Sequence, residues 1–194
     1  MDKEATLIVG LGNPGQKYQR TRHNLGFRLL AGFGEKQGWV AREKKEMKGR
    51  LALGTWNGKK VALLFPTTYM NLSGVAVRKV ASFYQVRQSN LLVVSDDTTL
   101  GFGRFRYRSC GSAGGHNGLK NIEAQLSSSH YARLRAGVGA PEGWQELSDY
   151  VLSPFTREEE AAMPKLVECA TRWVERWLDA NESERAVAET FAAC

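Results

Sequence analysis

The sequence has few cysteines, no long apolar run and fewer acidic than basic residues, and these shortages exclude several classes of protein. Its three cysteines lie at positions 110, 169 and 194, without the close pairs that a zinc site or a disulfide framework requires. No stretch approaches the roughly 18 consecutive apolar residues of a membrane-spanning helix. The amino terminus, Met1-Asp2-Lys3-Glu4, does not have the pattern of a signal peptide. We therefore expect a soluble, cytoplasmic protein with no membrane partner.

The shortage of acidic residues leaves the chain basic. It has 20 acidic residues and 27 lysines and arginines, which gives a net charge of +7. A basic surface attracts polyanions at long range, so nucleic acid is a candidate partner, although a basic enzyme with no such partner fits the charge equally well. A length of 194 residues with 42% hydrophobic composition suits one domain with a packed core. We expect residues 1–194 to form a single domain.

A glycine-rich polar stretch, residues 10–26, follows the apolar run Leu7-Ile8-Val9. Its Gly-x-Gly-x-x-Gly pattern is typical of dinucleotide-binding loops, in which a helix begins at the third glycine. Residues 16–24 contain no aliphatic side chain, however, and Pro14 disfavours a helical conformation at Asn13. We therefore expect a polar loop at the end of a strand. The alternative, a nucleotide-binding enzyme, depends on the glycine pattern alone.

The hydrophobic pattern predicts strands that alternate with helices. Strands are expected at residues 6–11, 50–56, 59–65, 91–94, 104–108 and 133–139, with a tight Asn57-Gly58 turn between the second and third. Helices are expected after Asn24 and Ser73 as N-caps, through residues 119–126, after a capping box at Thr156, and over residues 182–193. Residues 42–48 are predicted to be a solvated connection. These elements predict an α/β fold with a single domain and a mixed, twisted sheet flanked by helices.

Polar side chains follow several of these strands, and ligands of such sheets bind where strand ends and loops meet. The side chains are those of Asn13, His23, Asn71, Asp96 and Asn117. A histidine oriented by a carboxylate can take a proton from water, and asparagine can hold a peptide or ester group or support an oxyanion. His23 and Asp96 are the candidate pair. Each residue also has a structural interpretation: His23 could start a helix, and the aspartate and asparagines could cap helices or shape turns.

Five stretches together resemble the bacterial-type peptidyl-tRNA hydrolase family. They are residues 7–15, 21–26, 66–74, 111–120 and 133–135, which occur in the family's order across roughly residues 6 to 155. The resemblance implies a monomeric, single-domain α/β enzyme that hydrolyses the ester between a peptide and tRNA and so recycles tRNA. It implies no metal or organic cofactor and no obligate protein partner.

The resemblance also implies roles for particular residues of this chain. His23 resembles the general base that activates water, Asp96 the residue that orients it, and Asn13 a contact to the peptide beside the ester. Further substrate contacts are implied for Tyr18, Tyr69, Met70, Asn71, His116 and Asn117. The candidates for tRNA phosphate contacts are Arg108, Lys120, Arg133 and Arg135, because affinity for any tRNA should come from its backbone.

One region departs from the family pattern. Residues 96–101 read Asp-Asp-Thr-Thr-Leu-Gly where many members have Asp-Glu-Leu-Asp-Leu-Pro, and the departure is similar to plastid-type relatives. Some of those relatives act in group II intron splicing, so the alternative function is a non-catalytic RNA-binding splicing factor on the same fold. We favour the enzyme because the set of His23, Asp96 and three asparagines is complete and no plastid transit segment is recognised.

Overall fold

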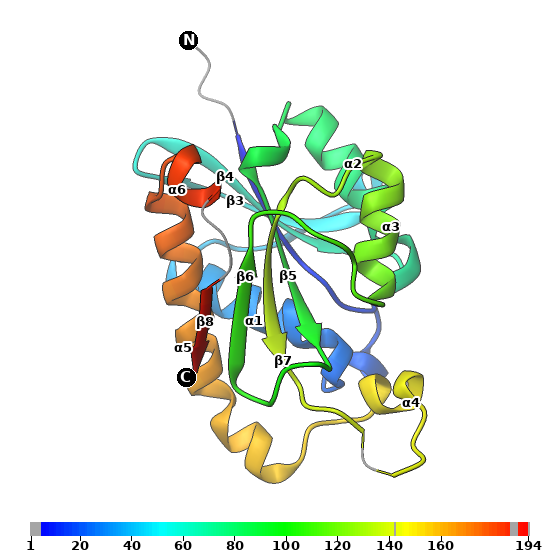
Figure 1. Cartoon of the computed structure of the whole chain (residues 1–194). Coiled ribbons are helices and arrows are strands. Elements are labelled where there is room, and N and C mark those ends of the chain that lie inside the picture. The colour runs from blue at the N-terminus through cyan, green and yellow to red at the C-terminus, as the bar shows by residue number, and fades with distance from the viewer. Residues whose placement is uncertain (1–4, 142, 187–189, 194) are drawn as a thin grey trace.

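A mixed sheet of eight strands forms the centre of the molecule (Figure 1). The computed structural model describes residues 5–141, 143–186 and 190–193, the last four as backbone only. The sheet order is β2-β3-β4-β1-β5-β7-β6-β8, and β1, β4, β5 and β7 are parallel to their neighbours within that group. The strands are β1 (Thr6–Gly10), β2 (Arg42–Lys44), β3 (Gly49–Trp56), β4 (Lys59–Pro66), β5 (Leu91–Asp97), β6 (Arg104–Arg108), β7 (Ala132–Gly137) and β8 (Thr190–Ala193).

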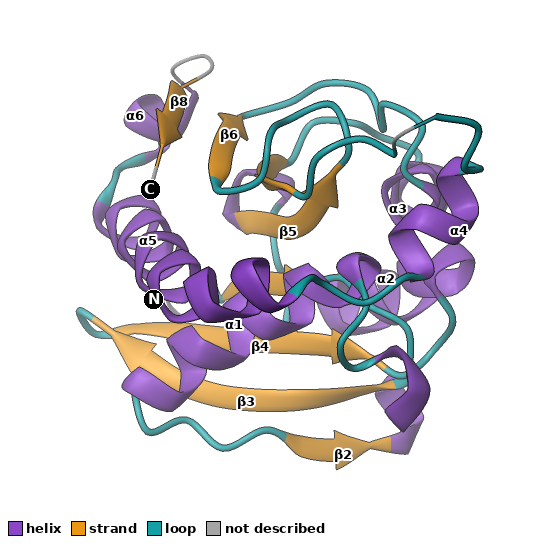
Figure 2. Cartoon of the chain, turned by 90° about the horizontal axis from the view of Figure 1, so that it is seen from below, coloured by secondary structure: helices purple, strands orange, loops and turns teal. Residues whose placement is uncertain are grey.

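Helices cover both faces of this sheet, as the view in Figure 2 shows. The face that carries Ile8 packs against α1 (Leu25–Lys36) and α5 (Arg157–Asp179), and the face that carries Leu7 and Val9 packs against α2 (Ser73–Phe83) and α3 (Asn117–Leu126). Two short helices are α4 (Leu147–Leu152) and α6 (Glu182–Ala186), and the 3-10 turns are η1 (Gln16–Tyr18), η2 (Arg22–Asn24), η3 (Lys45–Met47), η4 (Met70–Leu72) and η5 (Gln88–Asn90). Alternate residues of β1 therefore enter two separate cores, which confirms the expected α/β fold.

Two local predictions with a clear chemical cause are confirmed. Asn57 and Gly58 both have positive φ, 47° and 74°, and they join the antiparallel β3 and β4 as a two-residue turn. At the start of α5, the Glu159 N–H donates to Thr156 Oγ1 at 3.2 Å, and the Thr156 N–H donates to Glu159 Oε2 at 2.7 Å. This is the capping box that the sequence predicts.

The prediction for residues 42–48 is wrong, because part of this charged segment is a strand. Arg42, Glu43 and Lys44 form β2, which pairs antiparallel with β3 at the edge of the sheet, and η3 follows it. All three side chains of β2 are exposed. Charged side chains suit an edge strand because they discourage pairing with another molecule.

Other boundaries also differ from the prediction. Asn24 and Ser73 do not cap α1 and α2, and the side chain of Ser73 instead donates to the Met70 carbonyl at 2.8 Å. The strand predicted at residues 91–94 extends to Asp97, so Asp96 and Asp97 both belong to β5. In the predicted helix 182–193, only α6 is helical, β8 pairs with β6, and residues 187–189 lie outside the described residues. The sequence pattern did not predict α4. Within the described chain, no helix combines the length and the apolar character needed to cross a membrane.

Candidate active site

The candidate site lies beyond the carboxyl ends of the parallel strands β1 and β5, where η2, the end of β5 and the start of α3 meet. It surrounds a cavity of about 150 Å³ that is lined by His23, Asp96, His116 and Asn117, among others. Further lining residues are Asp97, Thr98, Gly114, Gly115, Arg135 and, from α4, Leu147, Ser148 and Val151. The structure therefore brings together five of the residues that the sequence indicated, since Arg135 was among the predicted phosphate contacts.

A close approach of backbone segments places His23 at this edge. The Leu11 N–H donates to the Val94 carbonyl at 2.9 Å, and the Phe27 N–H donates to the Leu11 carbonyl at 3.0 Å. Gly26 lies between these segments, and a Cβ there would collide with the Val94 carbonyl oxygen and with the backbone of Leu11. The absence of a side chain at Gly26 lets α1 begin directly against the strand ends, so η2 and His23 are held over β5.

Asp96 accepts hydrogen bonds from two histidines. Its two carboxylate oxygens each lie 3.0 Å from His23 Nδ1, and its Oδ1 lies 3.0 Å from His116 Nε2. The Asp96 side chain is 2% exposed, and the two imidazole rings that bond to it lie next to each other, with their centroids 4.9 Å apart and their planes tilted by 46°. Asp96 is therefore a buried acceptor shared between the two rings.

The backbone at the start of α3 determines which nitrogen of His116 carries the proton. His116 Nδ1 accepts from the N–H groups of Gly118 at 3.1 Å and Leu119 at 3.3 Å, so this nitrogen is unprotonated. Its proton is then on Nε2, which donates to Asp96. His23 Nδ1 likewise donates to the carboxylate, which leaves His23 Nε2 with a free lone pair and makes it the candidate base.

The Asp96 carboxyl stays ionised. Burial alone would raise its pKa, but the His116 and His23 imidazoles, by charge interaction and hydrogen bonding, hold the pKa of Asp96 well below its usual range. An ionised carboxylate can orient the His23 ring and stabilise the imidazolium that forms when the ring takes a proton.

His23, Asp96 and His116 are also the kind of set that binds a transition metal, since one ligand atom from each lies within 4.8 Å of the others. A metal at His116 Nε2 would require the proton of that ring to move to Nδ1. There it would point at the N–H groups of Gly118 and Leu119, which already donate to this nitrogen. The hydrogen bonds of His116 therefore suit a proton-transfer site and oppose metal binding.

Asn13 is held next to this site by Asn24. The Asn24 side chain accepts from the Asn13 N–H at 2.8 Å and donates to the Asn13 carbonyl at 2.9 Å. Asn13 Oδ1 in turn accepts from the Met70 N–H at 2.8 Å, which leaves the Asn13 Nδ2 group as a donor. Sequence reasoning took Asn24 for a helix cap and missed this role. Its position directly after His23 was the available signal.

The other predicted substrate residues lie around the same edge. Tyr18 and Tyr69 form an edge-to-face pair with ring centroids 6.4 Å apart, and 57% of Tyr69 is exposed. Met70 is buried, with its sulfur close to Gly118 at the start of α3. Asn117 is exposed and lines the cavity. The described residues that line it do not include Asn13, Tyr18, Tyr69, Met70 or Asn71, and Asn71 is exposed on η4.

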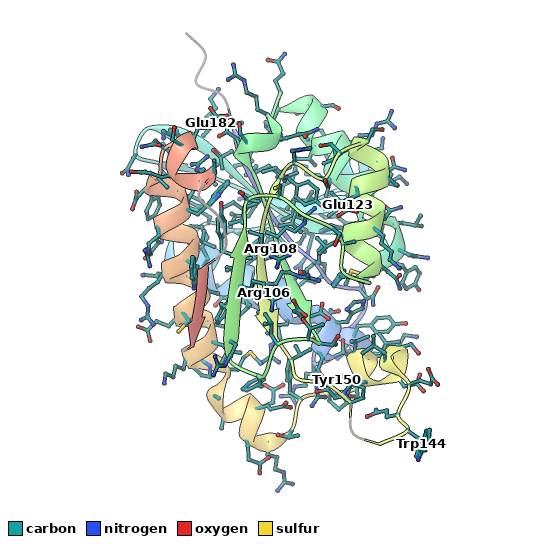
Figure 3. All side chains as sticks on the ribbon, in the orientation of Figure 1. Arg106, Arg108, Glu123, Trp144, Tyr150 and Glu182 are labelled. Carbon is teal, nitrogen blue, oxygen red and sulfur yellow. The ribbon has the colours of Figure 1, made fainter. Side chains whose placement is uncertain are left out.

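The four predicted phosphate contacts differ in accessibility. Lys120 is exposed on the first turn of α3, and Arg108 is partly buried on β6. Figure 3 shows Arg106 and Arg108 on the face of β6 that is turned to the viewer, between that strand and α3, which carries Glu123. Lys120, Arg106 and Arg108 are cations on the α3 side of the sheet, and they are referred to together as the basic surface.

Arg133 and Arg135 are buried and have protein partners. Arg133 is 1% exposed and donates to Glu123 Oε1 at 3.0 Å and to the Ser129 carbonyl at 3.3 Å. Arg135 Nε lies 3.1 Å from Asp97 Oδ2, and burial together with the neighbouring arginines lowers the pKa of Arg135, against the opposing charge of Asp97. A direct phosphate contact requires an accessible guanidinium, and Arg133 does not offer one in this structure.

Comparisons with known proteins agree on one family. The model of the Peptidyl-tRNA hydrolase family matches residues 7–193. A peptidyl-tRNA hydrolase of Clostridium beijerinckii is 46% identical over 86% of this chain and 85% of the relative, and one of Chloroflexus aggregans is 48% identical over 83% and 86%. The crystal structure of peptidyl-tRNA hydrolase from Acinetobacter baumannii is similar with a TM-score of 0.85 and 34% identity, covering 92% of this chain and 91% of that one.

Proposed function

This chain belongs to the peptidyl-tRNA hydrolase family, and we propose that His23 is the general base with which it hydrolyses the ester bond of peptidyl-tRNA. The hydrogen bond between His23 Nδ1 and the ionised Asp96 is the observation that carries this assignment. That bond leaves His23 Nε2 unprotonated at the wall of the cavity. The family gives the reaction, and this geometry supports the assignment of its base.

The reaction proceeds by attack of water on the ester carbonyl. His23 Nε2 takes one proton from the water while its oxygen forms a bond to the carbonyl carbon, and Asp96 stabilises the imidazolium. The bond to the ribose oxygen of tRNA then breaks, and the imidazolium returns the proton to that oxygen. The products are a peptide with a free carboxyl group and a tRNA with a free hydroxyl. The Asn13 Nδ2 group supplies a neutral donor for the carbonyl or for the adjacent peptide group.

His116 acts on the reaction through Asp96. The sequence suggested that it lines the cleft as a substrate contact, and it does line the cavity. Its Nε2–H, however, is directed to the Asp96 carboxylate and its Nδ1 to the backbone of α3. We therefore assign His116 to the positioning of Asp96, which in turn holds the ring of His23.

The tRNA backbone is bound on the basic surface. We assign direct phosphate contacts to the exposed Lys120 and to Arg108. Arg133 and Arg135 contribute to this surface indirectly. Arg133 pairs with Glu123 and Arg135 pairs with Asp97, and both pairs reduce the negative charge beside the surface. We further propose that the chain works as a cytoplasmic, single-domain monomer. The splicing alternative is not favoured, because it gives no reason for a buried aspartate shared by two histidines.

One comparison tests the function directly. Purified protein is incubated with an N-blocked aminoacyl-tRNA and, separately, with its unblocked counterpart, and release of the acyl group is followed. We expect rapid hydrolysis of the blocked substrate and slow hydrolysis of the free aminoacyl ester. Binding of both tRNAs without hydrolysis of either would favour the splicing alternative.

Replacing Asn13 with alanine is expected to reduce the discrimination between these two substrates by roughly tenfold, the size of one lost hydrogen bond to a buried polar group. The variant loses the Nδ2 donor. It also loses the hydrogen bond that Asn13 Oδ1 accepts from the Met70 N–H. Asn13→Asp keeps an acceptor for Met70 and lacks the donor, so its discrimination should fall as well. His130→Ala, which changes an exposed residue whose described contacts are to Ser128, is the control. Unchanged ratios in both Asn13 variants would make the role of Asn13 structural.

Replacing Lys120 with alanine is expected to raise KM and to lower the salt dependence of tRNA binding. Each phosphate contact that is lost reduces the slope of log affinity against log salt by about 0.7 to 0.9. Lys36→Ala is the matched control, because Lys36 pairs with Glu175 on the α1 and α5 face of the molecule at 2.8 Å. Equal slopes for the two variants would place the tRNA surface away from Lys120.

A further inference from the structure

Arg22, the residue before His23, is buried and binds a segment that is distant in the sequence. It is 6% exposed, and its guanidinium donates to Ser153 Oγ at 2.9 Å, to Glu159 Oε2 at 2.7 Å and to the Pro154 carbonyl. The same guanidinium lies over the rings of Tyr150 and Phe155, 4.5 and 5.3 Å from their centroids. One planar cation thus joins η2 to both the end of α4 and the start of α5.

The backbone forms a second connection between the same two segments. The Arg22 N–H donates to the Ser153 carbonyl at 3.1 Å, and Thr21 and Pro154 form an isolated β-bridge. Tyr150, on which the guanidinium lies, also donates its hydroxyl to the Val138 carbonyl at 2.6 Å. The carboxyl end of α4 is therefore attached to η2 and to the end of β7.

The other side of α4 faces the catalytic cavity. Leu147, Ser148 and Val151 line that cavity together with His23, and α4 stands at the ends of β5 and β7 in Figure 1. The residues before α4 extend away from the body, as the fully exposed Trp144 shows in Figure 3. The placement of α4 over the cavity consequently depends on its carboxyl end, where Arg22 binds.

We propose that Arg22 is a positioning residue that holds α4 as a wall of the catalytic cavity, so that productive substrate binding beside His23 depends on the Arg22 contacts. The proposal rests on the function proposed above. A lysine could keep the charge near Glu159, but one ammonium group cannot stack on Tyr150 and bind Ser153, Pro154 and Glu159 together. The planar guanidinium is thus the feature that the role requires.

The chain offers a matched control for this role. Arg28 on α1 makes two hydrogen bonds to Glu160 on α5, at 2.8 and 2.7 Å, and its guanidinium lies 5.6 Å from the centroid of Phe155. Arg28 therefore also connects an early segment to α5 and contacts an aromatic ring. In contrast to Arg22, the described contacts of Arg28 are to Glu160 and Phe155 and do not involve α4, so loss of Arg28 should affect stability and leave α4 in place.

The test compares Arg22→Met, Arg22→Lys and Arg28→Met. Backbone hydrogen exchange is measured at Asp149, Tyr150 and Ser153, whose N–H groups bond within α4 and its end. We expect exchange at these positions to become roughly tenfold faster or more in both Arg22 variants and to stay unchanged in Arg28→Met. With the N-blocked aminoacyl-tRNA, we expect KM to rise about tenfold in both Arg22 variants, with a smaller change in kcat. The low-field proton resonance of His23 Nδ1–H should remain, because Asp96 is untouched.

Three results would overturn the proposal. The first is that hydrogen exchange at the three measured positions is unchanged in Arg22→Met. The second is that Arg22→Lys has the exchange rates and the KM of the wild type. The third is that Arg28→Met changes exchange and KM as much as the Arg22 variants do. The exchange measurement needs no substrate, so a failure of the proposed function, seen as an inactive wild-type protein, is distinguishable from a failure of the role of Arg22. If Arg22→Met does not fold, Arg22→Lys alone decides, because the proposal requires its exchange and KM to change.

Discussion

Replacing His23 with alanine is expected to lower the rate of ester hydrolysis by on the order of 10³-fold or more, because removal of a positioned general base also removes the group that returns the proton to the leaving oxygen. The tRNA affinity should change little, since His23 lies in the cavity and the exposed cations lie outside it. Single-turnover hydrolysis of an N-blocked aminoacyl-tRNA measures the first quantity. Binding of uncharged tRNA measures the second.

The control for this variant is His130→Ala. His130 is exposed and its described contacts are to Ser128, so its loss should leave both hydrolysis and binding unchanged. Substantial residual turnover in His23→Ala would transfer the role of base to another group of the cavity. A parallel loss of tRNA affinity would instead mean that His23 binds the substrate.

The sequence predicted those features that depend on local chemistry or on the order of the strands. The Asn57-Gly58 hairpin and the Thr156 capping box each need only a few adjacent residues. The meeting of His23 and Asp96 follows from parallel strands, because the carboxyl ends of β1 and β5 lie side by side and any loop that follows them reaches the same edge.

Features that depend on register or on distant partners could not be predicted in this way. Arg108 of β6 and Arg133 of β7 are directly opposite in the strand pairing. Arg133 is nevertheless fully buried and Arg108 only partly, because the burial of each side chain depends on the elements that pack on its strand. Asn24 has the composition of a helix cap, and only the folded loop shows that its partner is Asn13. Arg22 binds residues more than 130 positions away.

Replacing Asp96 with asparagine is expected to lower the rate nearly as much as loss of His23, on the order of 10³-fold, because it changes the position of a proton. The His116 Nε2–H remains a donor, since the α3 backbone occupies Nδ1. The single amide oxygen of asparagine, at the position of Oδ1, accepts the hydrogen bond from His116 Nε2–H. The NH2 group, at the position of Oδ2, then faces His23 Nδ1. His23 can accept there only if its own proton moves to Nε2, where the base is needed.

Ionisation of Asp96 should itself add no pH dependence to the rate of the wild-type protein between about pH 5 and 8. The pKa of Asp96 lies below its usual range, so the carboxylate is ionised in the folded and the unfolded chain above about pH 5. Its stabilising contribution is lost only in stronger acid, as the pH falls through the lowered pKa of the folded state. A pH–rate profile of wild type and variant, each normalised to its own maximum, measures this.

The neighbouring aspartate is the control that separates orientation of His23 from general loss of charge. Asp97 pairs with Arg135 and accepts from the Thr99 N–H and hydroxyl at 2.8 and 2.7 Å. Asp97→Asn removes the same charge one residue away, so we expect an effect on KM through Arg135 and little effect on the single-turnover rate. Equal rate losses in the two variants would show that the rate depends on the negative charge at the end of β5 and does not depend on the tautomer of His23. A large loss in Asp96→Asn alone would require the shared-acceptor arrangement, because only Asp96 holds both imidazole rings.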